Sequence, residues 1–180
     1  MSGLVAFTVL VVLVALERLA ELVVSNRNAA WSLERGGVET GRGHYPFMVV
    51  LHSALLVGAL VEAWWLRPDV PPALAWSMVA VVLAAQGLRW WCILTLGQRW
   101  NTRVIVVPGM EPVARGPYAL VKHPNYVAVV LEGFALPLAH ACWITAVVFS
   151  VANAALLRTR IRVEDAALAT LPSVGLSTRA

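Results

Sequence analysis

Two short polar segments gather side chains that could do chemistry. The first, Gly116–Tyr126, reads GPYALVKHPNY, and the second, Arg160–Asp165, reads RIRVED. Together they bring an imidazole, phenols, guanidinium groups and adjacent carboxylates into a chain that is 59% hydrophobic and only 13% charged. Because polar groups are costly in so apolar a protein, dense polar segments are where function is expected.

The first segment predicts the entry to a helix. Glycine and proline at 116–117 favour a turn, and Pro124 biases His123 towards an extended backbone. His123 and Tyr126 would then flank a helix N-terminus, where free N–H groups attract anionic or electron-rich ligand atoms. The alternative is an interfacial pair of His and Tyr that anchors the helix among lipid headgroups.

The second segment allows two interpretations. Arg160 and Glu164 are four residues apart, so they could form an ordinary surface ion pair on a helix. Such a pair contributes about 0.5 kcal/mol or less. Glu164 and Asp165, however, run against the local excess of basic residues. Adjacent carboxylates there suit a ligand with a positive centre and ribose hydroxyls.

Composition predicts the elements that position these segments. The chain has 180 residues and a mean hydropathy of +0.74, and its charged fraction is about half the roughly 25% of a soluble domain. Long uncharged runs favour an all-α, polytopic membrane bundle over a soluble helical protein. We expect one domain with about five membrane segments, at Leu4–Val24, Pro46–Leu66, Ala73–Leu96, Tyr126–Leu136 and Ala141–Leu157. Polar loops are expected at Ser25–Tyr45 and Gly97–Asn125.

Pro137 and the basic residues set the expected topology. Pro137 should break the last apolar run into a tight helical hairpin. Of the 14 basic residues, three lie in the first polar loop, four in the second and four in the C-terminal tail, whereas Arg67 stands alone on the opposite side. The positive-inside rule therefore puts the N-terminus outside, and both polar segments and the C-terminus in the cytoplasm. This distribution explains the net charge of +4 without nucleic-acid binding.

Several polar residues inside or beside the apolar runs have more than one interpretation. Glu17, Arg18 and Glu21 either form a cluster among the headgroups or turn a polar face into the bundle. Glu132 is either functional or hydrogen-bonded to a neighbour. The apolar stretch 104–107 is too short to span, so it lies along the membrane surface or packs under the second loop.

The cysteines predict no metal or redox site. Cys92 and Cys142 each lie inside an apolar run, without the spacing of a metal site or a disulfide framework. We interpret both as packing residues and expect no metal.

The two polar segments, separated by a hairpin-sized apolar stretch, resemble the isoprenylcysteine carboxyl methyltransferase family of integral membrane proteins. GPYALVKHPNY is similar to the family's Gly-x-Tyr…Arg-His-Pro-x-Tyr box, and RIRVED to its Arg-x-Arg-x-Glu-Glu box, over about residues 87–170. The resemblance implies an all-helical membrane bundle that uses S-adenosylmethionine. The cofactor would lie in a cytosolic-side pocket built by residues 97–180, with residues 1–96 on the side of a lipophilic acceptor.

The resemblance also assigns roles. It implies a cofactor site made by Tyr118, Lys122, His123, Pro124, Tyr126, Glu164 and Asp165. Arg160 or Arg162 would orient the acceptor, and Glu164 is a candidate base. Two positions depart from the family pattern. Lys122 replaces an arginine and lacks its planar fork, and Asp165 replaces a glutamate and is one methylene shorter.

The N-terminal half resembles a bacterial subgroup thought to O-methylate phenolic lipids such as alkylpyrones or alkylresorcinols. The similar stretches are GHYP at 43–46 and LH at 51–52. The resemblance implies that His44, Tyr45 and His52 surround the acceptor and that Trp100, Asn101 and Arg103 close the pocket. Alternatively, His52 is a packing residue, and the loop from Trp100 binds headgroups. An integral protein of a bacterial inner membrane is expected.

The predicted function is methyl transfer from S-adenosylmethionine to an oxygen of a lipophilic acceptor taken from the bilayer. A carboxylate acceptor needs no base, whereas a phenol with an ordinary pKa of about 10 would benefit from one, such as His44 or Glu164. The alternatives are a membrane NADPH-dependent reductase and a non-enzymatic transport or assembly protein. The sequence has no Gly-rich dinucleotide fingerprint, which disfavours the reductase. Two polar segments on one face disfavour a transport or assembly protein. Membrane lipids are expected around the chain, and no obligate protein partner is evident.

Overall fold

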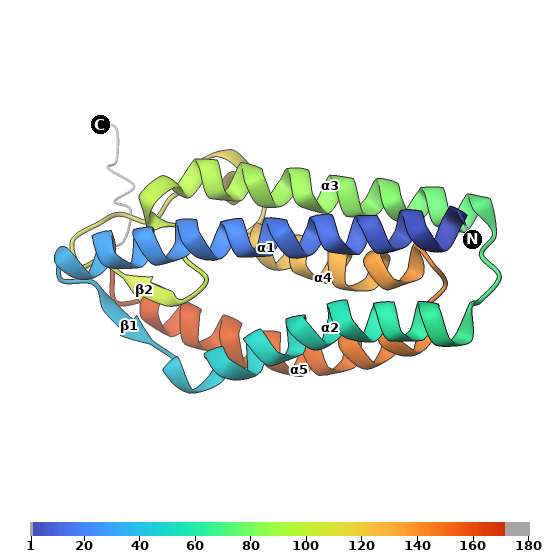
Figure 1. Ribbon diagram of the computed structural model, residues 1–180. Helices are drawn as coiled ribbons and strands as arrows, with labels where there is room; N and C mark the ends of the chain where they lie inside the picture. Colours follow the sequence, from blue (N-terminus) through green and yellow to red (C-terminus); the bar gives the residue numbers. More distant parts are fainter. Residues whose placement is uncertain (1, 172–180) are drawn as a thin grey trace.

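The computed structural model describes residues 2–171, and it is a bundle of five α-helices (Figure 1). The helices are α1 (Ser2–Glu34), α2 (Tyr45–Leu66), α3 (Pro72–Leu96), α4 (Pro124–Leu138) and α5 (Trp143–Leu168). Short 3-10 turns lie at η1 (Arg42–His44), η2 (Gly97–Arg99) and η3 (Gly116–Ala119). The strands β1 (Val38–Thr40) and β2 (Val104–Val106) form a small antiparallel sheet. The predicted all-α membrane bundle is confirmed.

Within residues 2–171, four helical segments are long and apolar enough to cross a bilayer, namely Ser2–Glu34, Arg42–Leu66, Pro72–Arg99 and Trp143–Leu168. The remaining helix, α4, has 15 residues, which is short of the roughly 20 that a full crossing needs. Helix α3 packs on α4, α4 on α5 and α5 on α2, and α1 runs along the assembled group (Figure 1). Large apolar side chains on the outer faces remain exposed, as lipid contact requires.

The proline-broken hairpin is confirmed. Pro137 lies in the last turn of α4, and Ala141 takes a left-handed conformation with φ of 52° at the tip. Glu62 of α2 then accepts hydrogen bonds from the backbone N–H groups of Ile144 and Thr145. These are free donors at the start of α5, so Glu62 caps that helix from a neighbouring one.

Helices α1 and α5 run ten or more residues past their predicted ends, and the predicted loop Ser25–Tyr45 is correspondingly wrong in its first part. Helix α1 continues ten residues past Val24 to Glu34. Its added turns are buried on one face, where Asn28 Nδ2 donates to the carbonyl oxygens of Gly97 and Trp100 at 3.1 and 2.8 Å. Tertiary hydrogen bonds thus extend a helix that the polar sequence predicted to stop.

Helix α5 also passes its predicted end, Leu157, and continues to Leu168. The segment Arg160–Asp165 therefore lies on a helix rather than in a tail. Arg179, counted above among the basic residues of the tail, lies outside the described residues. The stretch predicted to lie on the surface or under the second loop forms β2, which pairs with β1 so that Val104 faces Thr40.

The chain direction brings the polar segments together. Helices α1, α3 and α5 end, and α2 and α4 begin, towards the end of the bundle that carries the sheet (Figure 1). At the opposite end, Phe7, Val11 and Val14 of α1 pack on buried alanines that include Ala59 and Ala63 of α2. Small residues let the helices approach closely there, and the sheet end is left more open.

Candidate active site

A cavity of about 350 Å³ lies at the sheet end, and we call it the loop cavity. Strand β2 and the loop that follows it form one wall, and residues from η3 and the ends of α4 and α5 form the other. Its polar lining includes Tyr118, Lys122, His123, Tyr126 and Glu164. Both segments singled out in the sequence therefore meet around one cavity.

His123 lies between the two carboxylates of α5. Its Nε2 is 2.9 Å from Asp165 Oδ1, and its Nδ1 is 3.5 Å from Glu164 Oε1. Hydrogen bonding to Glu164 raises the pKa of His123 above its usual value, and burial of the ring opposes this effect only in part. Because ionised carboxylates only accept hydrogen bonds, the arrangement favours an imidazolium with both nitrogens protonated. Lys122 Nζ also lies 2.7 Å from Asp165 Oδ1.

The hydroxyl group of Tyr126 joins Arg160 to Glu164. It donates a hydrogen bond to Glu164 and accepts one from Arg160 Nε at 2.8 Å. The i, i+4 ion pair considered for Arg160 and Glu164 is not formed among the described residues. Arg160 is 5% exposed, donates also to the Thr102 carbonyl, and contacts Met48. A buried guanidinium group is thus held without a direct carboxylate partner in the part of the chain that the structure describes.

Local backbone geometry positions Tyr118. Gly116 opens η3 with φ of 58°, and a Cβ placed there would lie 2.7 Å from Thr95 Oγ1. Only glycine fits this approach to α3 without strain. Tyr118 follows two residues later and lines the loop cavity, and burial raises the pKa of its phenol.

A second cavity, of about 300 Å³, lies deeper in the bundle, and we call it the membrane cavity. Helices α1, α2 and α5 supply most of its wall, which is largely apolar. Four residues line both cavities and so form a shared wall: Trp100, Asn125, Tyr126 and Arg160. The polar side chains of the membrane cavity beyond this wall include Arg18, Glu21, His52, Arg89 and Asn153.

The residues predicted for the acceptor are divided between the cavities. Tyr45, His52 and Trp100 line the membrane cavity. Asn101 and Arg103 line the loop cavity instead, and His44 lines neither of the two.

Among the residues predicted for the cofactor and for catalysis, most lie at the loop cavity or touch its lining. Asp165 reaches it through His123. Pro124 is buried as the first residue of α4 and serves to start that helix. Arg162 is exposed and lines neither cavity, so the structure separates it from Arg160.

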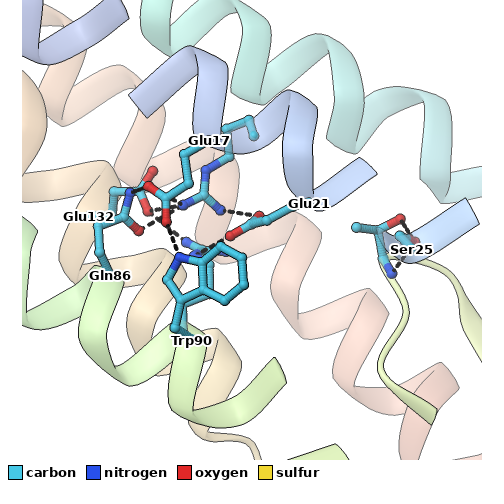
Figure 2. Close-up of polar contacts among 9 residues, drawn as sticks. Glu17, Glu21, Ser25, Gln86, Trp90 and Glu132 are labelled. Atoms are coloured by element: carbon cyan, nitrogen blue, oxygen red, sulfur yellow. Dashed lines mark hydrogen bonds and ion pairs between the residues drawn. The ribbon is translucent and has the colours of Figure 1, made fainter. Parts of the chain in front are cut away.

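A buried ionic cluster joins α1, α3 and α4 (Figure 2). Arg18 donates to Glu21, Gln86 and Glu132 at 2.6, 2.7 and 3.0 Å. Arg89 Nη2 donates to the same oxygen of Glu132 at 2.7 Å. Of the two interpretations of the α1 segment, the polar face turned into the bundle is the one observed. Glu132 is paired with both arginines.

Glu17 belongs to the same cluster on its outer side. It accepts hydrogen bonds from Gln86 and from Trp90 Nε1, the second at 2.6 Å (Figure 2). Ser25, one turn beyond Glu21 on α1, bonds instead to Asn101 and Thr102 and ties the loop to that helix (Figure 2).

Comparison with known proteins identifies the family of the chain. Residues 78–170 match the model of the isoprenylcysteine carboxyl methyltransferase (ICMT) family. The chain belongs to the ICMT family. It is also 38% identical over 163 residues to the uncharacterized protein YpbQ of Bacillus subtilis (strain 168). The aligned region covers 90% of this chain and 96% of YpbQ. No solved structure matches the chain.

Membership in the ICMT family makes the chain an integral membrane methyltransferase in general terms. The matched region runs from within α3 to the end of α5, and so it contains His123, Tyr126, Arg160 and Glu164. It leaves out α1 and α2, which supply much of the membrane cavity. The family model therefore describes only part of the lining of the membrane cavity.

Sequence reasoning missed two side chains on the ICMT scaffold. Asn153 of α5 is 3% exposed and lines the membrane cavity, and its Oδ1 has no hydrogen-bond partner in the described part of the chain. Gln86 of α3 links Arg18 to Glu17. Each is an uncharged polar residue in an apolar run, and polar residues at such positions are a signal for function in membrane proteins.

Proposed function

We propose that this protein is an S-adenosylmethionine-dependent methyltransferase that methylates an oxygen of a lipophilic acceptor. The cofactor would occupy the loop cavity, and the acceptor would enter the membrane cavity from the bilayer. The observation that carries this proposal is the wall shared by the two cavities, Trp100, Asn125, Tyr126 and Arg160. Two ligands on either side of that wall would meet there, as methyl transfer requires.

The loop cavity has groups suited to such a cofactor. Three buried polar atoms in its lining have no hydrogen-bond partner among the described residues: Trp100 Nε1, Asn101 Nδ2 and Asn125 Oδ1. They would bond to the adenine, ribose or amino-acid groups. Glu164 would attract hydroxyl groups or the positive centre, and Lys122 lies at the rim for a carboxylate. When bound, S-adenosylmethionine supplies a methyl group on a cationic sulfur.

Arg160 and Tyr126 would act on the acceptor oxygen. Arg160 has no direct carboxylate partner among residues 2–171, so its charge can stabilise an acceptor oxyanion. A hydroxyl acceptor would pass its proton to Tyr126 Oη while Tyr126 passes its own proton to Glu164. His123 would keep Glu164 oriented for that step. His44 lines neither cavity, so the base assigned here is Glu164.

The acceptor proposed is a phenolic lipid. The apolar lining of the membrane cavity, which includes Leu19, Leu22, Val49 and Leu56, would hold an alkyl tail between α1 and α2. Its polar head would lie near Tyr45 and Arg160. The positive-inside distribution supports a cytoplasmic position for the loop cavity, within reach of a soluble cofactor.

A labelled-methyl transfer assay tests the proposal. Membranes containing the protein, labelled S-adenosylmethionine and a lipid extract should yield a labelled lipid that mass spectrometry identifies. S-adenosylhomocysteine should also raise the melting temperature of the purified protein in detergent. If only a nicotinamide nucleotide stabilises the protein, the methyltransferase assignment fails.

A further inference from the structure

The membrane cavity contains a second polar region beyond the shared wall. Glu21 and Asn153 are each 3% exposed and line this cavity from α1 and α5. Glu21 Oε1 and Asn153 Oδ1 have no hydrogen-bond partner among residues 2–171. Glu21 Oε1 forms an ion pair with Arg89 Nε at 3.6 Å, which is longer than a hydrogen bond. A buried acceptor without a hydrogen bond is costly in a membrane protein, so two on one cavity suggest a ligand.

Donors without a hydrogen bond accompany these acceptors. Arg18 Nε is buried without a hydrogen-bond partner among the described residues, and Arg89 Nε makes only the 3.6 Å ion pair with Glu21 Oε1; both side chains line the same cavity. His52 adds a further acceptor. Its Nδ1 lies 2.8 Å from the Met48 carbonyl oxygen, which can only accept, so Nδ1 carries the proton and Nε2 of a neutral ring is an acceptor.

The charge of the cluster restricts the ligand further. Glu17, Glu21 and Glu132 face only Arg18 and Arg89 among the described residues, so the fully ionised cluster has one negative charge in excess. An anionic group would be repelled at this place. An ether or ketone could not satisfy the acceptors, because it donates no hydrogen bond. A hydroxyl group can donate to Glu21 or Asn153 and accept from an arginine.

The distance of Glu21 from Arg160 along the bundle fits a second hydroxyl group on the polar head of the same lipid. Thr102 bonds to Arg160 and to Ser25, which places the guanidinium group of Arg160 near the level of Ser25. Glu21 lies four residues deeper on α1, about 6 Å at the rise of an α-helix. A single ring with hydroxyl groups in meta positions spans a comparable separation.

We propose that Glu21 and Asn153 form a second subsite, which binds a hydroxyl group of the acceptor other than the one methylated. This inference rests on the proposed function, because it places the reacting oxygen at Arg160 and Tyr126. The subsite selects lipids whose head carries two hydroxyl groups, and it holds one of them away from the cofactor. The enzyme would therefore transfer one methyl group to such a lipid.

A binding experiment tests the subsite without the cofactor. The probes are 3-pentadecylphenol and 5-pentadecylbenzene-1,3-diol, which share a tail and differ by one hydroxyl group. Affinities are measured on the full chain in lipid nanodiscs. The wild type should bind the diol about tenfold more tightly than the phenol, as a hydrogen bond to a buried charged group allows. Equal affinities would overturn the proposal.

Two variants and one control locate the preference. Asn153→Leu removes one acceptor without changing charge, and Glu21→Gln removes the negative charge of the other; each should reduce the preference to about threefold or less. Glu17→Gln removes the same charge from the same cluster but does not line the cavity, so it should retain the preference. A preference that survives in both Asn153→Leu and Glu21→Gln would also overturn the subsite.

The binding of S-adenosylhomocysteine separates the two proposals. Binding of that compound without a preference for the diol would remove the subsite and leave the methyltransferase. A preference for the diol without binding of S-adenosylhomocysteine would remove the methyltransferase assignment and leave Glu21 and Asn153 as a binding site for a lipid hydroxyl group, without a role in methyl transfer.

Discussion

The hydroxyl group of Tyr126 contacts both Arg160 and Glu164. Tyr126→Phe removes it and keeps the ring. Because a positioned proton-transfer group contributes about 10²–10⁴-fold, we expect kcat for a phenolic acceptor to fall by about two orders of magnitude. The Kd of S-adenosylhomocysteine, measured by titration calorimetry, should change by less than about threefold. An unchanged kcat would show that the proton takes another route.

His123 predicts a pH dependence of stability. Its pKa in the folded protein is raised, chiefly by the hydrogen bond to Glu164, above the value of about 6.5 of an unfolded chain. The stabilisation is therefore complete below about pH 6.5 and is lost as pH rises through the raised pKa. The melting temperature of the wild type should fall over that range, and that of His123→Gln should fall less. Parallel curves for the two proteins would contradict this.

At single positions, the sequence predicted which residues belong to the site better than it predicted their hydrogen-bond partners. His123 and Glu164 were expected near one ligand, and the structure brings them within 3.5 Å. The link from Arg160 to Glu164 through Tyr126 was not predicted, since four-residue spacing on a helix favours a direct pair. Asn153 was missed because a lone asparagine in an apolar run carries no spacing signal.

Among the elements, η3 depends on one glycine. Gly116→Ala would add a Cβ 2.7 Å from Thr95 Oγ1 at a positive φ, and such strain costs about 1–3 kcal/mol. We expect a lower melting temperature and weaker binding of S-adenosylhomocysteine, because Tyr118 would shift. Adding Thr95→Ala removes the contact but not the backbone strain, so it should restore part of the loss. If the melting temperature of the double variant does not recover, the whole loss of stability comes from the backbone strain at the positive φ.

The helix boundaries show where local pattern is insufficient. Pro137 and the apolar runs predicted the hairpin and the spans, since both act locally. The ends of α1 and α5 were predicted too early, because polar residues after an apolar run also mark a loop. Contacts far apart in sequence, such as Asn28 with Trp100, decide that these turns remain helical.

For the whole molecule, the ionic cluster joins three helices inside an apolar bundle. Arg89→Met would leave Glu132 with one arginine and increase the excess negative charge. Removing one partner of a buried pair costs about 3–5 kcal/mol, so the melting temperature in detergent should fall strongly. Arg27→Met, at an exposed position on α1, should leave it nearly unchanged. Similar values for both variants would show that the cluster contributes little to stability.

The wall shared by the two cavities has a kinetic consequence. S-adenosylmethionine would bind from water and the acceptor from the bilayer. The concentration of each ligand is therefore defined in its own phase. The rate should follow the mole fraction of acceptor in the bilayer and the molarity of S-adenosylmethionine in solution. Diluting vesicles of fixed composition at constant enzyme-to-lipid ratio should then leave turnover per enzyme unchanged. The two products would also leave into different phases. Inhibition by the methylated lipid should therefore depend on the mole fraction of that lipid in the bilayer.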